Sequence, residues 1–549
     1  MEILENLLKE LNFHELHDHE LSFFVGSGIS VNSGMPLVSE LINTILKTVM
    51  DSKKHVDKIS NQKIPFEVFM NIFGEYSKEL LDIYSGGIPN TNHKLIAKLA
   101  REGHVCSIYT TNFDELIELA LNNEGLSENI DYKVYRTEKE IENSFKDSEL
   151  LKIYKIHGCI SKINSLRHTI RNVAFRENIL IREKILKKML NETSKLIIMG
   201  YSFSDFYDIN PIFEQNQNIK KEIIVVNHDL RNDVKIDKSV TKPMLNNNCW
   251  DITINTDDFV KVLWKIHLKD KYILDNINHD WKNNIKNWFE KIHFGYKEYI
   301  STILFIQQGQ IELGNYYCNK GMSKADSEFL KLELYLLKLL IIRSLKKIEK
   351  SDRYIKKAKK CIELLNNQDI AAYGSVNIAE FYLLVENYPK FEEEYHNLNV
   401  IMDSITNNII ISKYHRLGIQ YCIIKGQYAE VLTLCDRLLD FQLKNGLIID
   451  IPVTMHLKFK AYLELNDIVG AQNSLFELKN IPGLTNLTYQ PFIELSEIEY
   501  MVKCKKINIS EINHEIEKIW FKNENFQNNF VFDVFDKHAD YLLKKYNKD

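Results

Sequence analysis

The stretch FFVGSGISVNSGMP, residues 23–36, decides how the first half of the chain is organised. It begins inside an apolar run of the strand type and ends at Pro36, two residues before an amphipathic helical pattern starts at Val38. Three glycines, Gly26, Gly28 and Gly34, lie in this strand-to-helix connection. Such a turn brings backbone N–H groups and the positive end of a helix dipole together, which favours phosphate binding. Ordinary turn chemistry uses the same residues, so the stretch alone leaves both interpretations open.

Further runs of the strand type follow at intervals that leave room for crossover helices. With the first run, at 21–25, they lie at 105–110, 150–156, 195–200, 222–227 and 250–255. Several are apolar at nearly every position, which is typical of parallel strands buried on both faces. The sequence therefore predicts an α/β domain with a doubly wound, mostly parallel, Rossmann-like sheet.

Beyond about residue 270 the strand signals fade and apolar residues recur at helical spacing. Segments that begin at Lys413 and His456 align with a shift of 40, which places Leu417 on Leu457. A helix–turn–helix unit of this length indicates an all-α, tetratricopeptide-like helical repeat, with an irregular helical bundle as the alternative. We expect a catalytic domain at residues 1–270 and a helical sensor or regulatory domain at 271–549.

Composition narrows the class of protein. The 549 residues carry 70 Lys and Arg against 75 Asp and Glu, a net charge of -5, so no overall basic field favours nucleic acid and we expect none as a partner. The N-terminus lacks the pattern of a signal peptide, and no span of ~20 apolar residues occurs, so we expect a cytoplasmic protein without membrane contact. Eight cysteines include no CxxC pair, which argues against zinc and disulfides.

Polar or glycine residues follow five of the expected strands. They are Gly26-Ser27-Gly28, then Thr111, Asn112 and Asp114, then His157-Gly158, then Gly200 and Ser202, and finally Asn227. Each has an ordinary explanation as a helix cap, a core histidine or a turn. Because ligands bind beyond the carboxyl ends of the strands of a doubly wound sheet, their convergence on one edge predicts a nucleotide site.

A hydride-transferring dehydrogenase does not fit this site. The dinucleotide fingerprint GxGxxG needs glycine at its sixth position, where Val31 stands. It also needs an acidic residue at the end of a second strand about 20 residues later, and the segment there, MDSKKHVDK, does not have a strand pattern.

The motifs resemble those of the sirtuins in order and spacing. GSGISVNSGMP is similar to the sirtuin signature Gly-Ala-Gly-x-Ser followed by Gly-Ile-Pro, with Ser30, Gly34 and Pro36 among the matches. TTNFD resembles Thr-Gln-Asn-Ile-Asp, and KIHG resembles the strand with the catalytic His-Gly. PNTNHKLIAKL at 89–99 and GYS at 200–202 fall in the family order. The resemblance covers about residues 15–265.

This resemblance implies an NAD-binding domain that needs no metal. Asn112 and Asp114 would lie near the nicotinamide end, with Asn112 orienting the ribose or the attacking water, and His157 would be the base. Ser202 and Asn227 would lie toward the adenosine half. The residues expected to bind NAD are Gly26, Ser27, Gly28, Ser30, Gly34, Pro36, Thr111, Gly200, Ser202 and Asn227.

Two departures from the sirtuin pattern decide which activity the resemblance implies. The segment after His157-Gly158 has Cys159 alone instead of two CxxC pairs, and Val38-Ser39 replaces an aromatic-arginine pair. A sirtuin-like domain without zinc, joined to a helical half, is similar to bacterial anti-phage proteins that hydrolyse NAD to nicotinamide and ADP-ribose. We expect a homo-oligomer triggered by a phage protein that binds the helical half. A protein deacylase or ADP-ribosyltransferase, and a non-catalytic NAD or ADP-ribose sensor, remain alternatives.

Overall fold

The computed structural model divides the chain into two compact units. Unit 1 comprises Met1–Ile45 and Ile64–Trp288, and unit 2 comprises Leu46–Lys63 and Phe289–Asp549. The structure describes residues 2–61, 64–146, 150–173, 176–205, 209–215, 221–229, 234–238, 249–275, 277, 280–447, 450–479, 490–504, 506 and 511–522. The assignment of a catalytic role to residues 1–270 and a sensing role to 271–549 stays a prediction.

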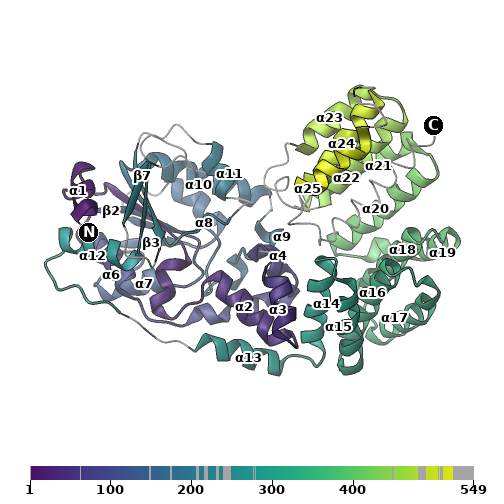
Figure 1. Cartoon of the computed structure of the whole chain (residues 1–549), viewed down its shortest axis with the longest axis horizontal. Helices are drawn as coiled ribbons and strands as arrows, with labels where there is room; N and C mark the ends of the chain where they lie inside the picture. The colour runs from purple at the N-terminus through teal and green to yellow at the C-terminus, as the bar shows by residue number, and fades with distance from the viewer. Residues whose placement is uncertain are drawn as a thin grey trace. The chain divides into compact units, whose positions relative to one another are not determined.

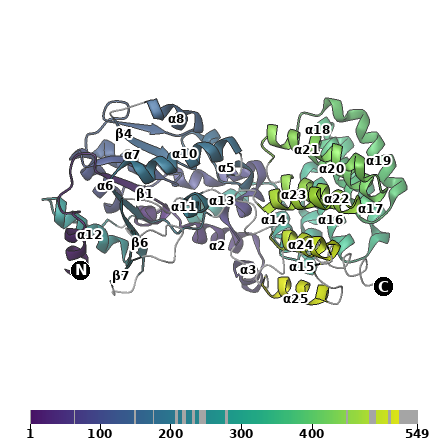
Figure 2. The same ribbon diagram turned by 90° about the horizontal axis from the view of Figure 1, so that it is seen from above.

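Unit 1 is built on one eight-stranded sheet with the order β3-β4-β2-β1-β5-β6-β8-β7. The strands are β1 (Leu21–Val25), β2 (Val105–Thr110), β3 (Tyr132–Tyr135), β4 (Leu151–Lys155), β5 (Lys195–Met199), β6 (Glu222–His228), β7 (Lys235–Lys238) and β8 (Cys249–Ile254). All neighbours are parallel except β7 and β8. Figure 2 labels β1, β4, β6 and β7 of this sheet in a view turned by 90° from Figure 1. The predicted mostly parallel, doubly wound sheet is confirmed.

Helices cover both faces of the sheet. One face packs on α1 (Glu2–Glu10), α6 (Thr91–Arg101), α7 (Leu116–Asn123) and α12 (Thr256–His267), and the other on α8 (Glu138–Asn143), α10 (Arg176–Glu192) and α11 (Ile209–Gln215). Figure 1 shows α10 and α11 on one side of the strands and α6, α7 and α12 on the other. Alternate residues of β1 supply the two cores, with Phe23 and Val25 facing one and Phe24 the other.

Shorter elements connect these layers. A 3₁₀-helix, η1 (Ser27–Ser33), follows β1 directly, and α2 (Val38–Val49) and α3 (Lys53–Ser60) come next. The end of α2 and all of α3 belong to unit 2. Unit 1 also contains α4 (Phe66–Asn71), η2 (Gly74–Tyr76), α5 (Ser77–Leu80), η3 (Leu81–Ser85), η4 (Ser144–Lys146), η5 (Ile163–Ser165) and α9 (Ile170–Val173), and α13 (Trp281–Lys291) begins in it. The helical α3 confirms that no second strand follows the glycine-rich turn at the dinucleotide-fingerprint distance.

Unit 2 consists of helix pairs in series, which Figure 1 shows in colours from teal to yellow. They are α14 (Tyr296–Gln307), α15 (Ile311–Lys324), α16 (Glu328–Ser344), η6 (Ile348–Lys350), α17 (Ser351–Leu365), α18 (Gln368–Leu384), α19 (Tyr388–Ile401), η7 (Met402–Ser404), α20 (Asn408–Ile424), α21 (Tyr428–Lys444), α22 (Ile451–Glu464), α23 (Ile468–Lys479), α24 (Gln490–Lys503) and α25 (Ile512–Lys522). Tyr388, Tyr428 and Ile468 each begin the second helix of a pair. The predicted repeat of 40 residues is confirmed there.

The loops that follow β1 and β5 cross at the point where the strand order of the sheet reverses. The N–H of Gly26 donates to the carbonyl of Met199 at 3.1 Å, and the N–H of Gly28 donates to the carbonyl of Gly200 at 2.9 Å. A Cβ on Gly28 would lie 2.7 Å from Gly200 Cα, and a Cβ on Gly200 would lie 2.5 Å from the backbone N of Ile29. The glycines are therefore required because one backbone passes against another.

This crossing predicts an unusually large cost for Gly200→Ala. Gly200 has φ +66, so alanine there combines left-handed strain with a backbone collision, and we expect the free energy of unfolding to fall by about 2–5 kcal/mol. Gly125→Ala is the matched control, because Gly125 has φ +87 with nothing within 4 Å of the added Cβ. It should lose about 1–2 kcal/mol. If chemical denaturation showed the same loss of unfolding free energy for Gly200→Ala and Gly125→Ala, the backbone contact at Gly200 would be contradicted.

Candidate active site

The carboxyl ends of four parallel strands meet at one edge of the sheet. Val25 at the end of β1 pairs with Thr110 of β2 and with Met199 of β5, and Thr110 pairs with Lys155 of β4. The loops that follow these strands carry the predicted catalytic residues and most of the predicted NAD-binding residues. We refer to this edge as the carboxyl rim.

A buried polar cluster lies at the rim between β1 and β2. Ser30, in η1, donates its hydroxyl proton to Asp114 Oδ2 at 2.9 Å. The amide Nδ2 of Asn112 lies 3.3 Å from the same serine oxygen. Asp114 also accepts from the N–H of Leu116, at the start of α7, at 3.2 Å. The structure thus brings together Ser30, Asn112 and Asp114, which the sequence places in two separate motifs.

The start of α6 adds two residues to this cluster. His93 Nε2 lies 3.2 Å from Ser30 Oγ, and His93 Nδ1 lies 2.9 Å from Asn90 Oδ1. Asn90 caps α6, and its Nδ2 donates to the carbonyl of Ile29 at 2.7 Å. Burial lowers the pKa of His93 to about 4, against the raising effect of Asp114. His93 is therefore uncharged at neutral pH.

Asn90 and His93 were not among the residues predicted from the sequence. The segment PNTNHKLIAKL was recognised only for its place in the motif order. A signal was present, because an asparagine three residues before a histidine at a helix start allows a reciprocal cap, which the structure contains. Contact with Ser30, 63 residues away along the chain, has no local signature.

Asn112 keeps one polar atom available. Its Oδ1 is buried and has no hydrogen-bond partner among the described residues, while its backbone N–H donates to Thr110 Oγ1 at 3.0 Å. An unpartnered buried carbonyl oxygen is costly unless a ligand supplies a donor. Hydroxyl and carboxamide groups are suitable donors, and NAD carries both.

His157 lies just beyond the end of β4, the strand next to β2. Its side chain is buried, and its carbonyl accepts from the N–H of Arg167 at 2.8 Å. Gly158 follows at φ +80, where a Cβ would lie 2.1 Å from the carbonyl oxygen of Ser165. The loop that holds His157 is therefore tightly closed. The strand order brings Asn112, Asp114 and His157 to the ends of adjacent strands.

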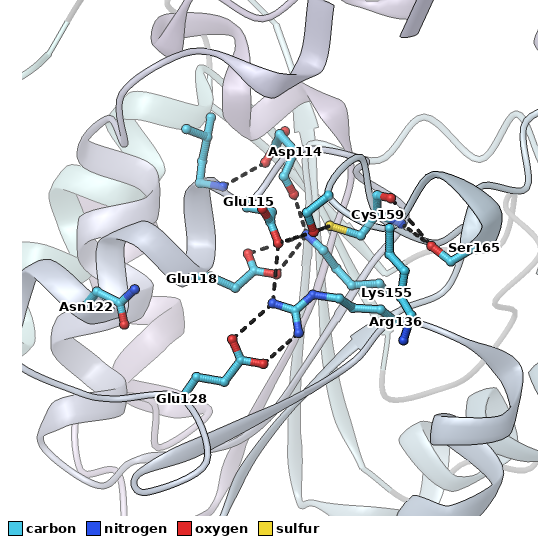
Figure 3. A network of polar contacts seen from close by, with 12 residues as sticks. Asp114, Glu115, Glu118, Asn122, Glu128, Arg136, Lys155, Cys159 and Ser165 are labelled. Carbon is cyan, nitrogen blue, oxygen red and sulfur yellow. Dashed lines mark hydrogen bonds and ion pairs between the residues drawn. The ribbon is translucent and has the colours of Figure 1, made fainter. Parts of the chain in front are cut away.

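A buried cation lies beneath this rim, as Figure 3 shows. Lys155 donates to the main-chain carbonyl of Asp114 and pairs with Glu118 of α7 at 3.1 Å. Burial alone would lower the pKa of Lys155, but the charges of Glu118, Cys159 and Asp114 and the hydrogen bond to Glu118 together hold the pKa above its usual range. Next to this pair, Arg136 contacts Glu115 at 3.3 Å and Glu128 at 2.6 Å.

The predicted NAD-binding residues in the loops after β1 and β2 make mainly backbone contacts within the rim. The N–H groups of Gly26 and Gly28 are used in the loop crossing. Gly34 ends η1 at φ 82 and Pro36 is buried, while the N–H of Thr111 donates to the carbonyl of Val25 at 3.3 Å. These residues shape the rim, and their contact with NAD stays a prediction.

Toward β5 and β6 the predicted residues are Ser202 and Asn227. Ser202 is exposed, with its hydroxyl oxygen 2.8 Å from that of Ser204. Asn227 lies inside β6, and its Nδ2 donates to Asp251 of β8. Ser27 is half-buried at the start of η1 and Gly200 is in the crossing.

Within the described ranges, no group of three or more His, Cys, Asp or Glu residues is arranged to hold a metal ion. No described helix is both long enough and apolar enough to cross a membrane.

Comparison with known proteins gives three curated relatives, all called NAD(+) hydrolase ThsA. The protein of Cytobacillus dafuensis is 26% identical over 219 residues, 37% of this chain and 39% of the relative. That of Bacillus cereus (strain MSX-D12) is 27% identical over 158 residues, 28% of this chain and 31% of the relative. That of Acinetobacter baumannii (strain 532279) is 30% identical over 147 residues, 26% of this chain and 28% of the relative. The chain thus matches well under half the length of each.

A solved structure also aligns with the chain. It is a Signal Transduction ATPase with Numerous Domains from Pyrococcus horikoshii with a tetratricopeptide repeat sensor, and the alignment covers 98% of this chain and 94% of that one at 12% identity. The TM-score of 0.35 is too low to indicate a shared overall fold.

The family match includes β2, β4 and β5 of the rim and does not include β1. Residues 106–236 match the family described as SIR2-like domain, a range that includes Asn112, Asp114 and His157. The predicted resemblance to sirtuins is therefore confirmed over residues 106–236 of unit 1.

Proposed function

We propose that the protein is an NAD+ hydrolase that releases nicotinamide and ADP-ribose, and that it acts in anti-phage defence by depleting NAD+. The observation that carries this proposal is the buried Ser30–Asn112–Asp114–His93 cluster. It leaves the Oδ1 of Asn112 without a partner in the described part of the chain, next to the strand that leads to His157. The relatives called NAD(+) hydrolase, which match 26–37% of this chain, support the same reaction.

The chemistry requires little more than positioning. Cleavage of the bond between nicotinamide and ribose passes through an oxocarbenium-like state. Asn112, held through its Nδ2 by Ser30, orients a ribose hydroxyl or the attacking water through Oδ1. His157 accepts a proton from that water as its oxygen bonds to the ribose carbon and nicotinamide leaves. The Asp114 carboxylate, held by Ser30 and the N–H of Leu116, stabilises positive charge that develops on the ribose.

The first test is incubation of the purified full chain with NAD+, with the products resolved by mass. We expect nicotinamide and ADP-ribose without added metal and without an acylated peptide. A strict requirement for acyl-lysine would favour the deacylase, and transfer of ADP-ribose to protein would favour the transferase. If no nicotinamide is released, either with or without phage lysate, a non-catalytic NAD or ADP-ribose sensor would explain the domain better than a hydrolase.

Substitution of the two central side chains tests their roles. His157→Ala should lower kcat by roughly 10²–10⁴ with little change in NAD affinity, because it removes proton transfer. Asn112→Ala should lower kcat by a similar factor, because the attacking water or the ribose loses its orientation. His104→Ala, before the amino end of β2, is the control and should keep kcat within about threefold. Near-full activity in folded His157→Ala and Asn112→Ala proteins would make these residues structural.

We further propose that unit 2 senses a phage protein and controls the rim. Support comes from α2, whose residues after Ile45 belong to unit 2 while its start follows Pro36 and η1 in unit 1. Within unit 2, Tyr317 accepts from the N–H of Asp51 at 2.9 Å and lies 2.8 Å from His55 Nδ1. Lys320 pairs with Asp51 at 2.5 Å.

The segment that leaves unit 1 also touches the rim elements. Asp275 contacts Thr91 Oγ1 at 3.2 Å and Lys94 Nζ at 2.7 Å, in the first turn of α6. The N–H of Ile277 donates to the carbonyl of Asn32 in η1 at 2.9 Å. Two of the three chain connections between the units, those after Ile45 and after Trp288, are therefore preceded by segments that attach to elements carrying Ser30 or His93. The proposed setting is the cytoplasm, and the proposed assembly is a homo-oligomer.

Weakening the attachment of residues 46–63 tests this coupling. Asp51→Asn combined with Tyr317→Phe removes the ion pair with Lys320 and the hydroxyl contacts to Asp51 and His55. We expect NAD+ cleavage that no longer responds to infection, measured as cellular NAD+ with and without phage. Tyr414→Phe, which loses one hydroxyl contact to Asn399 in the same unit, should still respond. A normal response in the double variant would show that α2 does not carry the signal.

A further inference from the structure

Lys155 is a charged side chain in an unusual place. It is the last residue of β4, two residues before His157, and its side chain has 0% exposure. Its ammonium has two partners, the carboxylate of Glu118 on α7 and the main-chain carbonyl of Asp114 (Figure 3). Taking a lysine and a glutamate out of water costs several kcal/mol per ion, so the pair is a costly way to fill space.

Stability alone does not account for this pair. Apolar side chains of similar volume at both positions would often leave a domain as stable or more stable. What an apolar residue cannot do is donate a hydrogen bond to the carbonyl of Asp114. The Glu118 carboxylate keeps the ammonium charged and directed at the loop after β2.

The Asp114 residue is held from two sides. Lys155 binds its carbonyl, and Ser30 binds its carboxylate at 2.9 Å. Asn112, two residues earlier, donates to the same serine. Lys155 therefore connects the loop that carries Asn112 and Asp114 with the strand that delivers His157.

We propose that Lys155 is a positioning residue for NAD+ cleavage, which sets the loop after β2 against the strand end that carries His157. This inference rests on the proposed function. Displacement of a reacting group by about 1 Å can cost roughly 10²-fold in rate. Loss of the Lys155 contact should therefore lower kcat, while KM for NAD+ changes little because the other rim residues remain in place.

The decisive variant replaces both ions, Lys155→Met with Glu118→Met, in the full-length chain. Replacing both avoids an unpaired buried charge, so the melting temperature should stay within a few degrees. We expect kcat to fall at least tenfold with KM within about threefold. Amide hydrogen exchange in residues 111–116 should accelerate at least tenfold, because the loop has lost its hydrogen bond from Lys155 to the carbonyl of Asp114.

Two further variants separate the contact from general effects. Glu118→Gln removes the carboxylate that keeps the ammonium charged and directed at the loop, so it should lower kcat and also the melting temperature, because the buried charge loses its counterion. Lys195→Met with Glu20→Met removes a second lysine–glutamate pair of the same sheet, at the amino end of β5, and should change neither kcat nor exchange in 111–116.

The outcomes distinguish this inference from the proposed function. Unchanged loop exchange, or unchanged kcat in the Lys155/Glu118 double-methionine chain, would overturn the positioning role. If the unaltered chain releases no nicotinamide, the hydrolase proposal fails, and the role of Lys155 in catalysis fails with it, whereas the exchange result still reports whether Lys155 holds the loop.

Discussion

The crossing of the loops after β1 and β5 is the constraint on which the rest of the site depends. Adjacent parallel strands lie only about 4.8 Å apart, so loops that leave the same edge must pass each other closely. Gly26, Gly28 and Gly200 make this possible because no Cβ separates the backbones. The chain can then turn at once into η1, which delivers Ser30 to Asp114 and His93. A wider crossing would move Ser30 away from both.

Around that crossing, the polar groups are fixed before any ligand arrives. Ser30 is the shared partner of Asn112 and Asp114, both in the loop after β2, and of His93 in α6. Burial keeps His93 neutral, and the Lys155–Glu118 pair lies beneath the loop with its charges matched. Preorganised dipoles of this kind act strongly at a buried site because water does not compete for them. The proposed reaction therefore depends more on how these groups are positioned than on the reactivity of any one side chain.

The sequence predicted the parts of the fold that have a local signature. Six strands were expected close to their observed bounds, because buried parallel strands are apolar throughout. β3 and β7 were missed, since each has four residues, lies at an edge of the sheet and contains lysine. The 3₁₀ form of η1 was also missed, as was the role of the glycines: their N–H groups were expected to face phosphate, and at Gly26 and Gly28 they bind backbone carbonyls.

Contacts between distant segments had no signal in the sequence. The sequence pattern of Lys155 is that of an ordinary strand lysine, and the structure shows Glu118 beside it. The bond from Asn227 to Asp251 on the next strand also had no signal, and the role of Asn227 in NAD binding stays a prediction. Likewise, the pattern of α2 gives no sign that its end and α3 belong with the helical unit.

The most direct test of the central claim is a crystal structure of the full-length His157→Ala chain with NAD+. The account predicts the nicotinamide ribose within hydrogen-bond distance of Asn112 Oδ1 and the diphosphate near the loop crossing; NAD+ bound only in the helical unit, or at the amino edge of the sheet, would contradict it.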